Sequence, residues 1–373
     1  MIWIVAIVIV LLVFWAVARF HLEGPDLSRF DQPVFAPMNE APSAQNAQTV
    51  ARVKEMVAAA GEHKGREQLT FMREAMEAMG AEADITGVEI APVTVAGRPA
   101  EWVTPASGEI TGRLLYLHGG AFSMGSPRSH RVITAELARR TGLALLVLEY
   151  RLLPEHRRPD GIEDVRAAYR WLLQHGPQGP GTDQPLFVAG DSAGGNLALM
   201  LIAWVRDELR AGATDLRQLD GAIALSPLTD ATFASPSTRH NVDQDPMLGR
   251  MAKMINRMPR SLLLWSAWLR ARIPPADPQL SPVYGDLSAL PPVLIQASEA
   301  EILIDDARRY ANKARAAGSP VELQTWHGMV HVWQAFGRDL PETEQAFNLM
   351  DDFIKRVITI HNQPDVISLR RGQ

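Results

Sequence analysis

The amino-acid sequence predicts an α/β fold with a mostly parallel central sheet, helices on both of its faces and a helical cap. Three observations support this class. From residue 113 to residue 361, short apolar segments alternate with segments of helical periodicity. The apolar segments are continuous, as in parallel strands that are buried on both faces. Residues 231–278 interrupt the alternation without a strand pattern, and we interpret this insertion as part of the cap.

The segment before the sheet is predicted to contain two helices and a hairpin. Residues 47–60 and 67–79 carry apolar side chains at helical spacing, and we assign residues 47–85 to the N-terminal part of the cap. Residues 88–94 and 101–104 flank a Gly-Arg-Pro turn, which is typical of a hairpin. The first strands of the sheet are therefore expected to be antiparallel.

The sheet domain is predicted to extend over residues 86–362, followed by a polar tail at residues 363–373. Its later strands are expected at residues 113–117, 143–149, 186–189, 221–225, 293–297 and 321–325. Its helices are expected at residues 130–140, 161–174, 196–210, 305–317 and 343–361.

Composition excludes several classes of function. The 373 residues suffice for one large core with insertions. The net charge is −5 and there is no long basic run, so no nucleic-acid partner is predicted. The chain has no cysteine, which excludes disulfides, thiolate metal sites and a thiol nucleophile. We predict no metal and no cofactor, and the sequence leaves the oligomeric state open.

The first residues form an apolar segment that predicts a membrane anchor. Residues 2–18 contain no charge and no proline, and Trp3 and Trp15 lie near the two ends. Interfacial tryptophans are typical of a spanning helix. We therefore assign residues 1–19 to a single-pass anchor and the proline-containing residues 20–46 to a tether.

A cleaved secretory signal is the alternative interpretation of this segment. Ala16-Val17-Ala18 is typical of a cleavage site with small residues, but the positively charged region that begins such signals is missing. If the segment is an anchor, Arg19 at its C-terminal flank favours a cytoplasmic location of the sheet domain.

A candidate nucleophile lies in the turn Gly190-Asp191-Ser192-Ala193-Gly194-Gly195. The turn follows the apolar residues 185–189 and precedes the predicted helix at 196–210. A serine at the apex of such a turn is exposed at a helix N-terminus, and the flanking glycines allow the strand and the helix to approach closely. Small residues that only close a turn give the same pattern, so other parts of the site must decide.

A serine nucleophile needs a base, and in the α/β-hydrolase order both the acid and the histidine follow the serine along the chain. His327 and His331 follow the last predicted strand. Either of them is better placed to act as the base than His240, which lies in the insertion, or His361, which lies in the last predicted helix.

Four carboxylates follow the predicted strand at 293–297: Glu299, Glu301, Asp305 and Asp306. Asp305 and Asp306 begin the next helix, where a carboxylate commonly has a structural role. The residue types alone leave the acid open, with Glu299 or Glu301 better placed on the loop.

The oxyanion that forms during acyl transfer is expected to bind backbone amides. The segment His118-Gly119-Gly120-Ala121-Phe122 follows a predicted strand and offers the amides of Gly119 and Gly120, and Ala193 after the serine adds a third. The spacing matches neither nucleotide-binding glycine fingerprint.

These segments together resemble the hormone-sensitive-lipase-like esterases of the α/β-hydrolase fold. The resemblance covers roughly residues 88–361 and rests on four motifs. These motifs are residues 118–122, Tyr150-Arg151-Leu152-Leu153-Pro154-Glu155-His156, residues 190–195 and His327-Gly328-Met329-Val330-His331. It implies that Ser192 is the nucleophile and His331 the general base. It also implies oxyanion donors at Gly119, Gly120 and Ala193.

The resemblance carries further expectations. Many relatives have an Asp-Pro-Leu-x-Asp acid motif, and aligning it here places Glu301 at the first aspartate, so Glu301 is the expected acid and Asp305 the second choice. His118 is expected to shape its loop, and Arg151 and Glu155 to form structural ion pairs. The family's cap combines N-terminal helices with an insertion, as predicted here.

Within the insertion, Met247, Met251, Met254 and Met258 recur at helical spacing. Packing onto the sheet domain is the commoner use of such a stripe, but a pocket lining is compatible with it. Phe122, Met247 and Met251 are our candidates for the substrate pocket.

We therefore expect a membrane-tethered serine carboxylesterase that hydrolyses short to medium acyl esters through an acyl-enzyme. A small-molecule ester is the expected partner. Lactone or amide hydrolysis, or acyl transfer, by the same serine is the first alternative. A non-catalytic protein that binds a small ligand on a hydrolase scaffold is the second.

Overall fold

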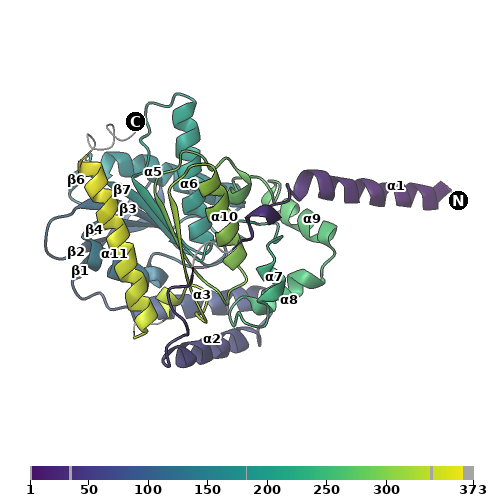
Figure 1. Cartoon of the computed structure of the whole chain (residues 1–373), viewed down its shortest axis with the longest axis horizontal. Helices are drawn as coiled ribbons and strands as arrows, with labels where there is room; N and C mark the ends of the chain where they lie inside the picture. The colour runs from purple at the N-terminus through teal and green to yellow at the C-terminus, as the bar shows by residue number, and fades with distance from the viewer. Residues whose placement is uncertain (1, 33–35, 182, 337–338, 364–373) are drawn as a thin grey trace.

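A computed structural model describes residues 2–32, 36–181, 183–336 and 339–363 (Figure 1). Its centre is an eight-stranded sheet in the order β1-β2-β4-β3-β7-β8-β9-β10. The strands are β1 Val88–Val95, β2 Arg98–Pro105, β3 Gly112–Leu117, β4 Leu143–Leu148, β7 Leu186–Asp191, β8 Gly221–Leu225, β9 Val293–Ser298 and β10 Val321–Trp326. The hairpin β1-β2 pairs antiparallel with β4, and all later neighbours are parallel. The predicted fold class is confirmed.

Helices cover both faces of this sheet. One face carries α4 Arg131–Thr141 and α11 Pro341–Asn362, and the other carries α5 Arg158–Gln174, α6 Ala193–Arg210 and α10 Ile304–Ala316. Strand side chains alternate between the two resulting cores: Leu115 and Leu117 of β3 belong to the core under α5 and α6, whereas Leu114 and Tyr116 belong to the core under α4 and α11. Because both faces are apolar, the strands are continuously buried, as predicted.

Two details of the sheet domain differ from the sequence-based expectation. Helices α5 and α6 each begin three residues earlier than predicted, and Asp160 caps the first turn of α5 by accepting the Arg157 N–H at 2.8 Å. A pair of two-residue strands, β5 His175–Gly176 and β6 Gly179–Pro180, follows α5. Strands this short leave no periodicity in the sequence.

The insertion, residues 231–278, forms three helices and contains no strand: α7 Ser237–His240, α8 Gly249–Arg257 and α9 Arg260–Ala271. The methionine repeat does not form the continuous helical face that its spacing predicted. Helix α8 ends before Met258, and Pro259 starts the new direction of α9. Met254, within α8, is 66% exposed. In Figure 1 these helices lie on the side from which α1 projects.

Helix α1, Ile2–Val17, projects away from the body and continues into a π-helical turn, Ala18–Leu22 (Figure 1). The combined segment is long and apolar enough to cross a membrane. An 18-residue stretch of it has a mean hydropathy of 2.7, and only 6% of that stretch is buried in the protein. A signal sequence near an N-terminus has the same properties.

The described residues of the predicted tether, 20–32 and 36–46, lie against the sheet domain rather than extending as a free linker. Asp31 forms an ion pair with Arg309 of α10, and the Met38 N–H donates to the carbonyl of Thr325 at 2.7 Å. Its prolines prevent a long helix, as expected, but side-chain and main-chain contacts still fix its path.

Helices α2, Asn46–Ala60, and α3, Gly65–Ala81, confirm the two predicted N-terminal helices. Arg73 of α3 donates to the carbonyls of Ser123 and Leu153 at 2.8 and 3.0 Å and forms an ion pair with Glu155 at 2.8 Å. These bonds fix α3 to loops at the carboxyl edge of the sheet. The division of the chain into cap and sheet domain stays a prediction, and residues 364–373 of the predicted tail lie outside the described residues.

Candidate active site

Ser192 occupies a strained turn between β7 and α6. Its backbone has φ +50° and ψ −111°, a conformation that costs energy in a residue other than glycine. A Cβ on Gly194 would lie 1.8 Å from the carbonyl oxygen of Leu117, and one on Gly190 would lie 2.4 Å from the carbonyl carbon of Gly194. Both glycines are therefore required by close backbone approach, which explains the motif physically.

The parallel strands bring Ser192 and the loop of His331 to the same edge of the sheet. The Ser192 N–H donates to the carbonyl of Leu225 at the end of β8, at 2.7 Å. The next residue, Ser226, accepts the Val332 N–H on its hydroxyl at 3.3 Å. The last residue of β8 and the residue after it thus connect the serine turn with the histidine loop.

His331 and Glu301 form a buried hydrogen-bonded pair. His331 Nδ1 lies 2.5 Å from Glu301 Oε2, and the side chains are 4% and 0% exposed. The other carboxylate oxygen of Glu301 accepts the Ser298 N–H at 2.7 Å, which fixes the carboxylate at the end of β9. Burial alone would lower the pKa of His331, but the hydrogen bond and charge of Glu301 raise that pKa above its ordinary value.

The other carboxylates near Glu301 have structural partners. Asp305 accepts the Ser237 N–H at 2.7 Å and pairs with Arg308 at 3.0 Å. Asp306 accepts the N–H groups of two residues in the loop after β8, Thr229 and Asp230, and Glu299 pairs with Arg308. Within the described residues, Glu301 is the acid that contacts His331.

His327, the other histidine of the last loop, is held away from this pair. Its N–H donates to the side chain of Asn39 at 2.7 Å, and its carbonyl accepts from the same side chain at 3.3 Å. The loop position alone left the choice of base between His327 and His331 open, and in the structure only His331 of these two contacts Glu301.

The glycine loop after β3 lies next to the serine turn, but its first amide is already engaged. The Gly119 N–H donates to Asp191 Oδ1 at 3.0 Å. The N–H groups of Gly120, Ala121 and Ala193 donate no hydrogen bond to any described residue. The amide of Gly119, one of the three expected oxyanion donors, is therefore used within the protein, because a buried carboxylate lies beneath it.

A buried charged network under this loop was not found by sequence reasoning. Asp191 accepts the Tyr116 hydroxyl at 2.8 Å and lies 3.3 Å from His130 Nε2. Burial would raise the pKa of Asp191, but the charge of His130 holds it below its usual value; burial would lower the pKa of His130, but Asp191 raises it. His130 is 61 positions from Asp191, and no local pattern connects them.

His118 is buried beneath the same loop and stays neutral. Its ring stacks on Tyr150 with centroids 4.3 Å apart, its Nδ1 lies 2.9 Å from the carbonyl oxygen of Gly119, and Tyr150 donates to the His118 carbonyl at 2.6 Å. Burial lowers the pKa of His118 to about 3. This environment suits a residue that shapes the loop.

The three pocket candidates lie near the loops of the site. Met247 packs against the apolar cluster of Val330 beside His331, and Met251 packs against the cluster of Ile302 beside Glu301. The ring of Phe122 is covered by the buried guanidinium of Arg158 at 3.4 Å.

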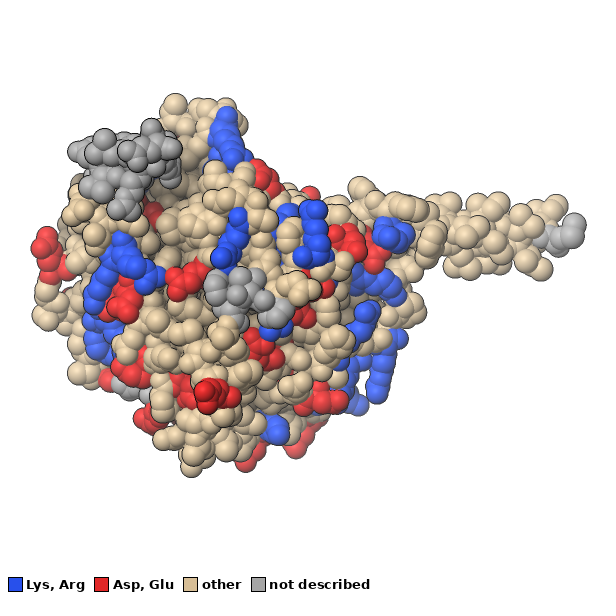
Figure 2. All heavy atoms as spheres, viewed as in Figure 1, with Lys and Arg blue, Asp and Glu red and all other residues tan. Residues whose placement is uncertain are grey.

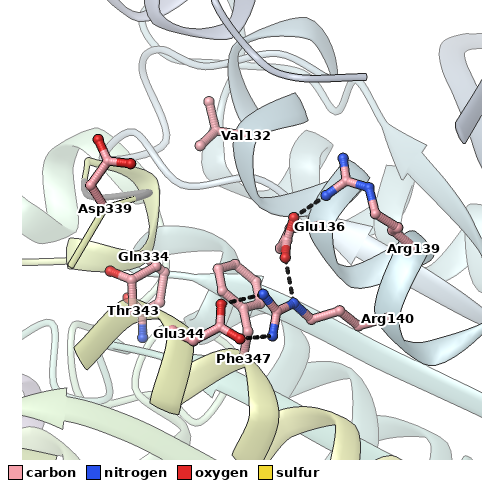
Figure 3. Close-up of a pocket in the computed structure, with 9 residues that line it drawn as sticks. All are labelled: Val132, Glu136, Arg139, Arg140, Gln334, Asp339, Thr343, Glu344 and Phe347. Carbon is pink, nitrogen blue, oxygen red and sulfur yellow. Dashed lines mark hydrogen bonds and ion pairs between the residues drawn. The ribbon is translucent and has the colours of Figure 1, made fainter. Parts of the chain in front are cut away.

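A separate hollow of about 520 Å³ between α4 and α11 contains none of these residues (Figure 3). Its charged side chains pair with one another: Arg140 binds Glu344 and Glu136, and Arg139 binds Glu136. Of these pairs, Arg140–Glu344 joins the two helices, whereas the two pairs of Glu136 lie within α4. Among the described residues, no group of three or more histidine or acidic side chains is placed to hold a metal ion.

Comparison with known proteins identifies the family. Residues 114–335 match the family described as alpha/beta hydrolase fold. An acetyl-hydrolase of Streptomyces hygroscopicus is 39% identical over 272 residues, which are 70% of this chain and 81% of the relative. An esterase of Acinetobacter venetianus is 34% identical over 266 residues, which are 71% and 82% of the two chains.

A crystal structure of an esterase from the bacterial hormone-sensitive lipase family has a TM-score of 0.70 and 33% identity, covering 83% of this chain and 98% of that one. The chain belongs to the alpha/beta hydrolase fold family and, within it, to the hormone-sensitive-lipase-like esterases, as its motifs predicted. It is an enzyme of the carboxylic ester hydrolase class.

Proposed function

We propose that the protein is a serine carboxylesterase in which Ser192 attacks the ester, His331 transfers the proton and Glu301 orients His331. The hydrogen bond of 2.5 Å between Glu301 and His331 is the observation that supports this most. It lies at the same sheet edge as the strained turn that carries Ser192. A nucleophile, a base and an orienting acid are the parts that acyl transfer requires.

The chemistry then follows in two balanced steps. Ser192 Oγ bonds to the carbonyl carbon while its proton passes to His331 Nε2, and Glu301 stabilises the resulting imidazolium. Collapse of the tetrahedral intermediate breaks the bond to the alcohol oxygen, which takes the proton from His331. Water repeats the sequence on the acyl-enzyme and releases the acid.

The oxyanion of each tetrahedral intermediate is bound by the amides of Gly120 and Ala193. The amide of Ala121 takes the place first expected for Gly119, because the Gly119 N–H is donated to Asp191. Preorganised amides of this kind each contribute roughly 10²–10³-fold in rate.

The substrates are esters with short to medium acyl chains. The methionines beside the loops of His331 and Glu301 provide an adaptable apolar surface, and the acetyl-hydrolase relative supports a small acyl group. Turnover of p-nitrophenyl esters from acetate to laurate tests this range, with the highest kcat/KM expected at the short and medium chains.

The nucleophile is tested by Ser192→Ala with Ser266→Ala as the matched control. Ser266 lies in α9, where its hydroxyl donates to the carbonyl of Leu263. We expect Ser192→Ala to lose p-nitrophenyl butyrate hydrolysis and fluorophosphonate labelling with an unchanged circular dichroism spectrum, and Ser266→Ala to keep both. Turnover or labelling retained in folded Ser192→Ala contradicts the proposal.

The alternative functions are distinguished by the reaction products and by labelling. A lactonase or amidase acts on its substrate through the same labelled serine, and an acyltransferase forms a new ester when an alcohol acceptor is present. A binding protein stays unlabelled by the fluorophosphonate.

We propose that α1 anchors the enzyme in a membrane as a single-pass helix. The exposure of Ile2–Val17 and the hydropathy of Ile2–Leu22 support an anchor. Recovery of the chain in the membrane fraction with residues 1–19 still attached is the expected result. A shortened chain in the soluble fraction identifies a cleaved signal instead.

A further inference from the structure

Helix α1 is fixed to the insertion rather than attached by a flexible linker. The rings of Phe14 and Trp265 stack with centroids 4.8 Å apart at 12°, and Trp265 Nε1 donates to the carbonyl of Phe14 at 3.0 Å. One turn later, Ala18 and Leu22 are buried against Leu264 of α9. The direction of α1 relative to α9 is therefore set by packing.

This contact limits how far the protein body can lie from a membrane that α1 crosses. The residues of α1 before Phe14, 2–13, give a free helix about 18 Å long at 1.5 Å per residue. A hydrocarbon core is about 30 Å thick. If α1 spans it, the contact between Phe14 and Trp265 must lie in the membrane, and α9 must reach the lipid interface.

The surface of the insertion has the chemistry that this position requires. Residues 246–276 contain six Lys and Arg and no Asp or Glu, although the whole chain carries −5. Figure 2 shows basic side chains gathered on this side, below the base of α1. We define the α8–α9 face by eight of the exposed side chains on the two helices and their ends: Arg250, Lys253, Met254, Arg257, Leu262, Leu269, Arg270 and Arg272.

Apolar and basic side chains are interleaved on this face. Leu262 and Leu269 are 50% and 52% exposed, and they are seven residues apart on the same side of α9 as Trp265. Arg257 and Arg270 form no ion pair with any described residue. Exposed leucines beside unpaired arginines are typical of a helix that lies in a membrane interface.

We propose that the α8–α9 face is a membrane-docking surface that binds the headgroups of anionic phospholipids, with Leu262 and Leu269 inserted among the upper acyl chains. This rests on the proposed anchor and goes beyond the esterase activity. A bilayer fits better than a second copy of the chain, because two copies of a face that carries five cationic side chains and no acidic one repel each other. The helix α1 supplies the attachment, and the face sets the orientation of the enzyme on the membrane.

The absence of cysteine allows a direct test on the full chain in liposomes. Leu262→Cys and Leu269→Cys carry an environment-sensitive fluorophore, and Ile360→Cys is the control. Ile360 is 49% exposed on α11, and Figure 1 shows α11 on the side of the body away from α1 and α9. The vesicles contain phosphatidylcholine and phosphatidylglycerol. For the probes at 262 and 269, but not for the probe at 360, we expect blue-shifted emission, loss of quenching by aqueous iodide, and quenching by lipids that are spin-labelled near the headgroup.

Probes at 262 and 269 that are as accessible to iodide as the probe at 360 overturn the proposal. If the membrane-associated protein is found to have lost α1 by cleavage, the proposal is also overturned, because it rests on the anchor. The proposal is also overturned if the shielding of these probes from iodide depends on protein concentration at a constant amount of lipid and spin-labelled lipids do not quench them. That result indicates self-association of the protein. None of these results depends on ester hydrolysis, so the esterase proposal is tested separately.

The charge component is tested by lipid composition. In pure phosphatidylcholine, we expect weaker shielding of the probe at 262 than in vesicles with phosphatidylglycerol. Arg257→Gln with Arg270→Gln is expected to remove this difference, whereas Arg356→Gln on α11 keeps it. Shielding that is independent of anionic lipid in every variant contradicts the role of the cations.

Discussion

His331 Nδ1 lies 2.5 Å from Glu301 Oε2, although the two residues come from loops after different strands, β10 and β9. Because β9 and β10 are parallel neighbours, their carboxyl ends meet and the two loops face each other. A bond at Nδ1 leaves Nε2 as the ring nitrogen that can accept a proton.

Glu301→Gln is expected to lower the activity and to move its pH dependence. The general base acts when it is neutral, so the raised pKa of His331 places the acidic limb of kcat/KM above the ordinary histidine value of about 6.5. Removing the carboxylate charge lowers that pKa, and the limb moves to lower pH. We expect kcat to fall by about 10²–10⁴-fold, measured with p-nitrophenyl butyrate from pH 4 to 9 (about two units on each side of the limb).

Asp305→Asn is the matched control for the acid. It keeps the side-chain volume but removes the charge that pairs with Arg308 and weakens the bond from the Ser237 N–H. We expect a loss of stability in urea with an unchanged acidic limb. A shifted limb in Asp305→Asn and an unshifted one in Glu301→Gln would mean that Asp305 is the acid.

The sequence was informative wherever a local pattern reflects a local cause. Continuous apolar strands are buried on both faces, and the glycines around Ser192 are forced by backbone approach within one turn. The engagement of Gly119 could not be predicted, because it depends on Asp191 and on His130, which meet only through the sheet. The position of Asp31 in the segment before α2 likewise depends on a distant partner, Arg309.

Arg73→Ala is expected to loosen the oxyanion loop from a distance. Arg73 bonds to the carbonyl of Ser123 in that loop and to Glu155, whose pKa it lowers to about 2. We expect kcat to fall about tenfold, less than the loss from removing an oxyanion donor, because the amides remain but are less rigidly placed. Arg52→Ala removes an exposed arginine that pairs with Glu82 and should leave kcat unchanged. Equal kcat values in the two variants would show that Arg73 does not position the loop.

His118→Phe tests whether the neutral His118 makes stability depend on pH. The unfolded chain protonates this histidine near pH 6.5, but burial keeps the pKa in the folded protein at about 3. The depressed pKa contributes stability above the unfolded value, and this contribution is lost as the pH falls. Between pH 7.5 and pH 5 the wild type should lose about 2 kcal/mol relative to His118→Phe, which cannot titrate but keeps the ring stacking on Tyr150. Parallel urea curves for the two proteins at both pH values would contradict a buried neutral histidine.

Gly194→Ala is expected to destabilise the fold at the turn that exposes Ser192. The new Cβ would lie 1.8 Å from the carbonyl oxygen of Leu117, which belongs to the central strand β3 and cannot move without breaking sheet pairing. We expect a loss on the order of 3 kcal/mol or more in the free energy of unfolding, measured by urea denaturation. Gly176→Ala is the control, because its Cβ meets its nearest atom at 3.5 Å and its φ is not positive. Similar stabilities of the two variants would mean that the strand and helix are not held together as closely as the motif requires, and the physical account of the exposed serine would then be wrong.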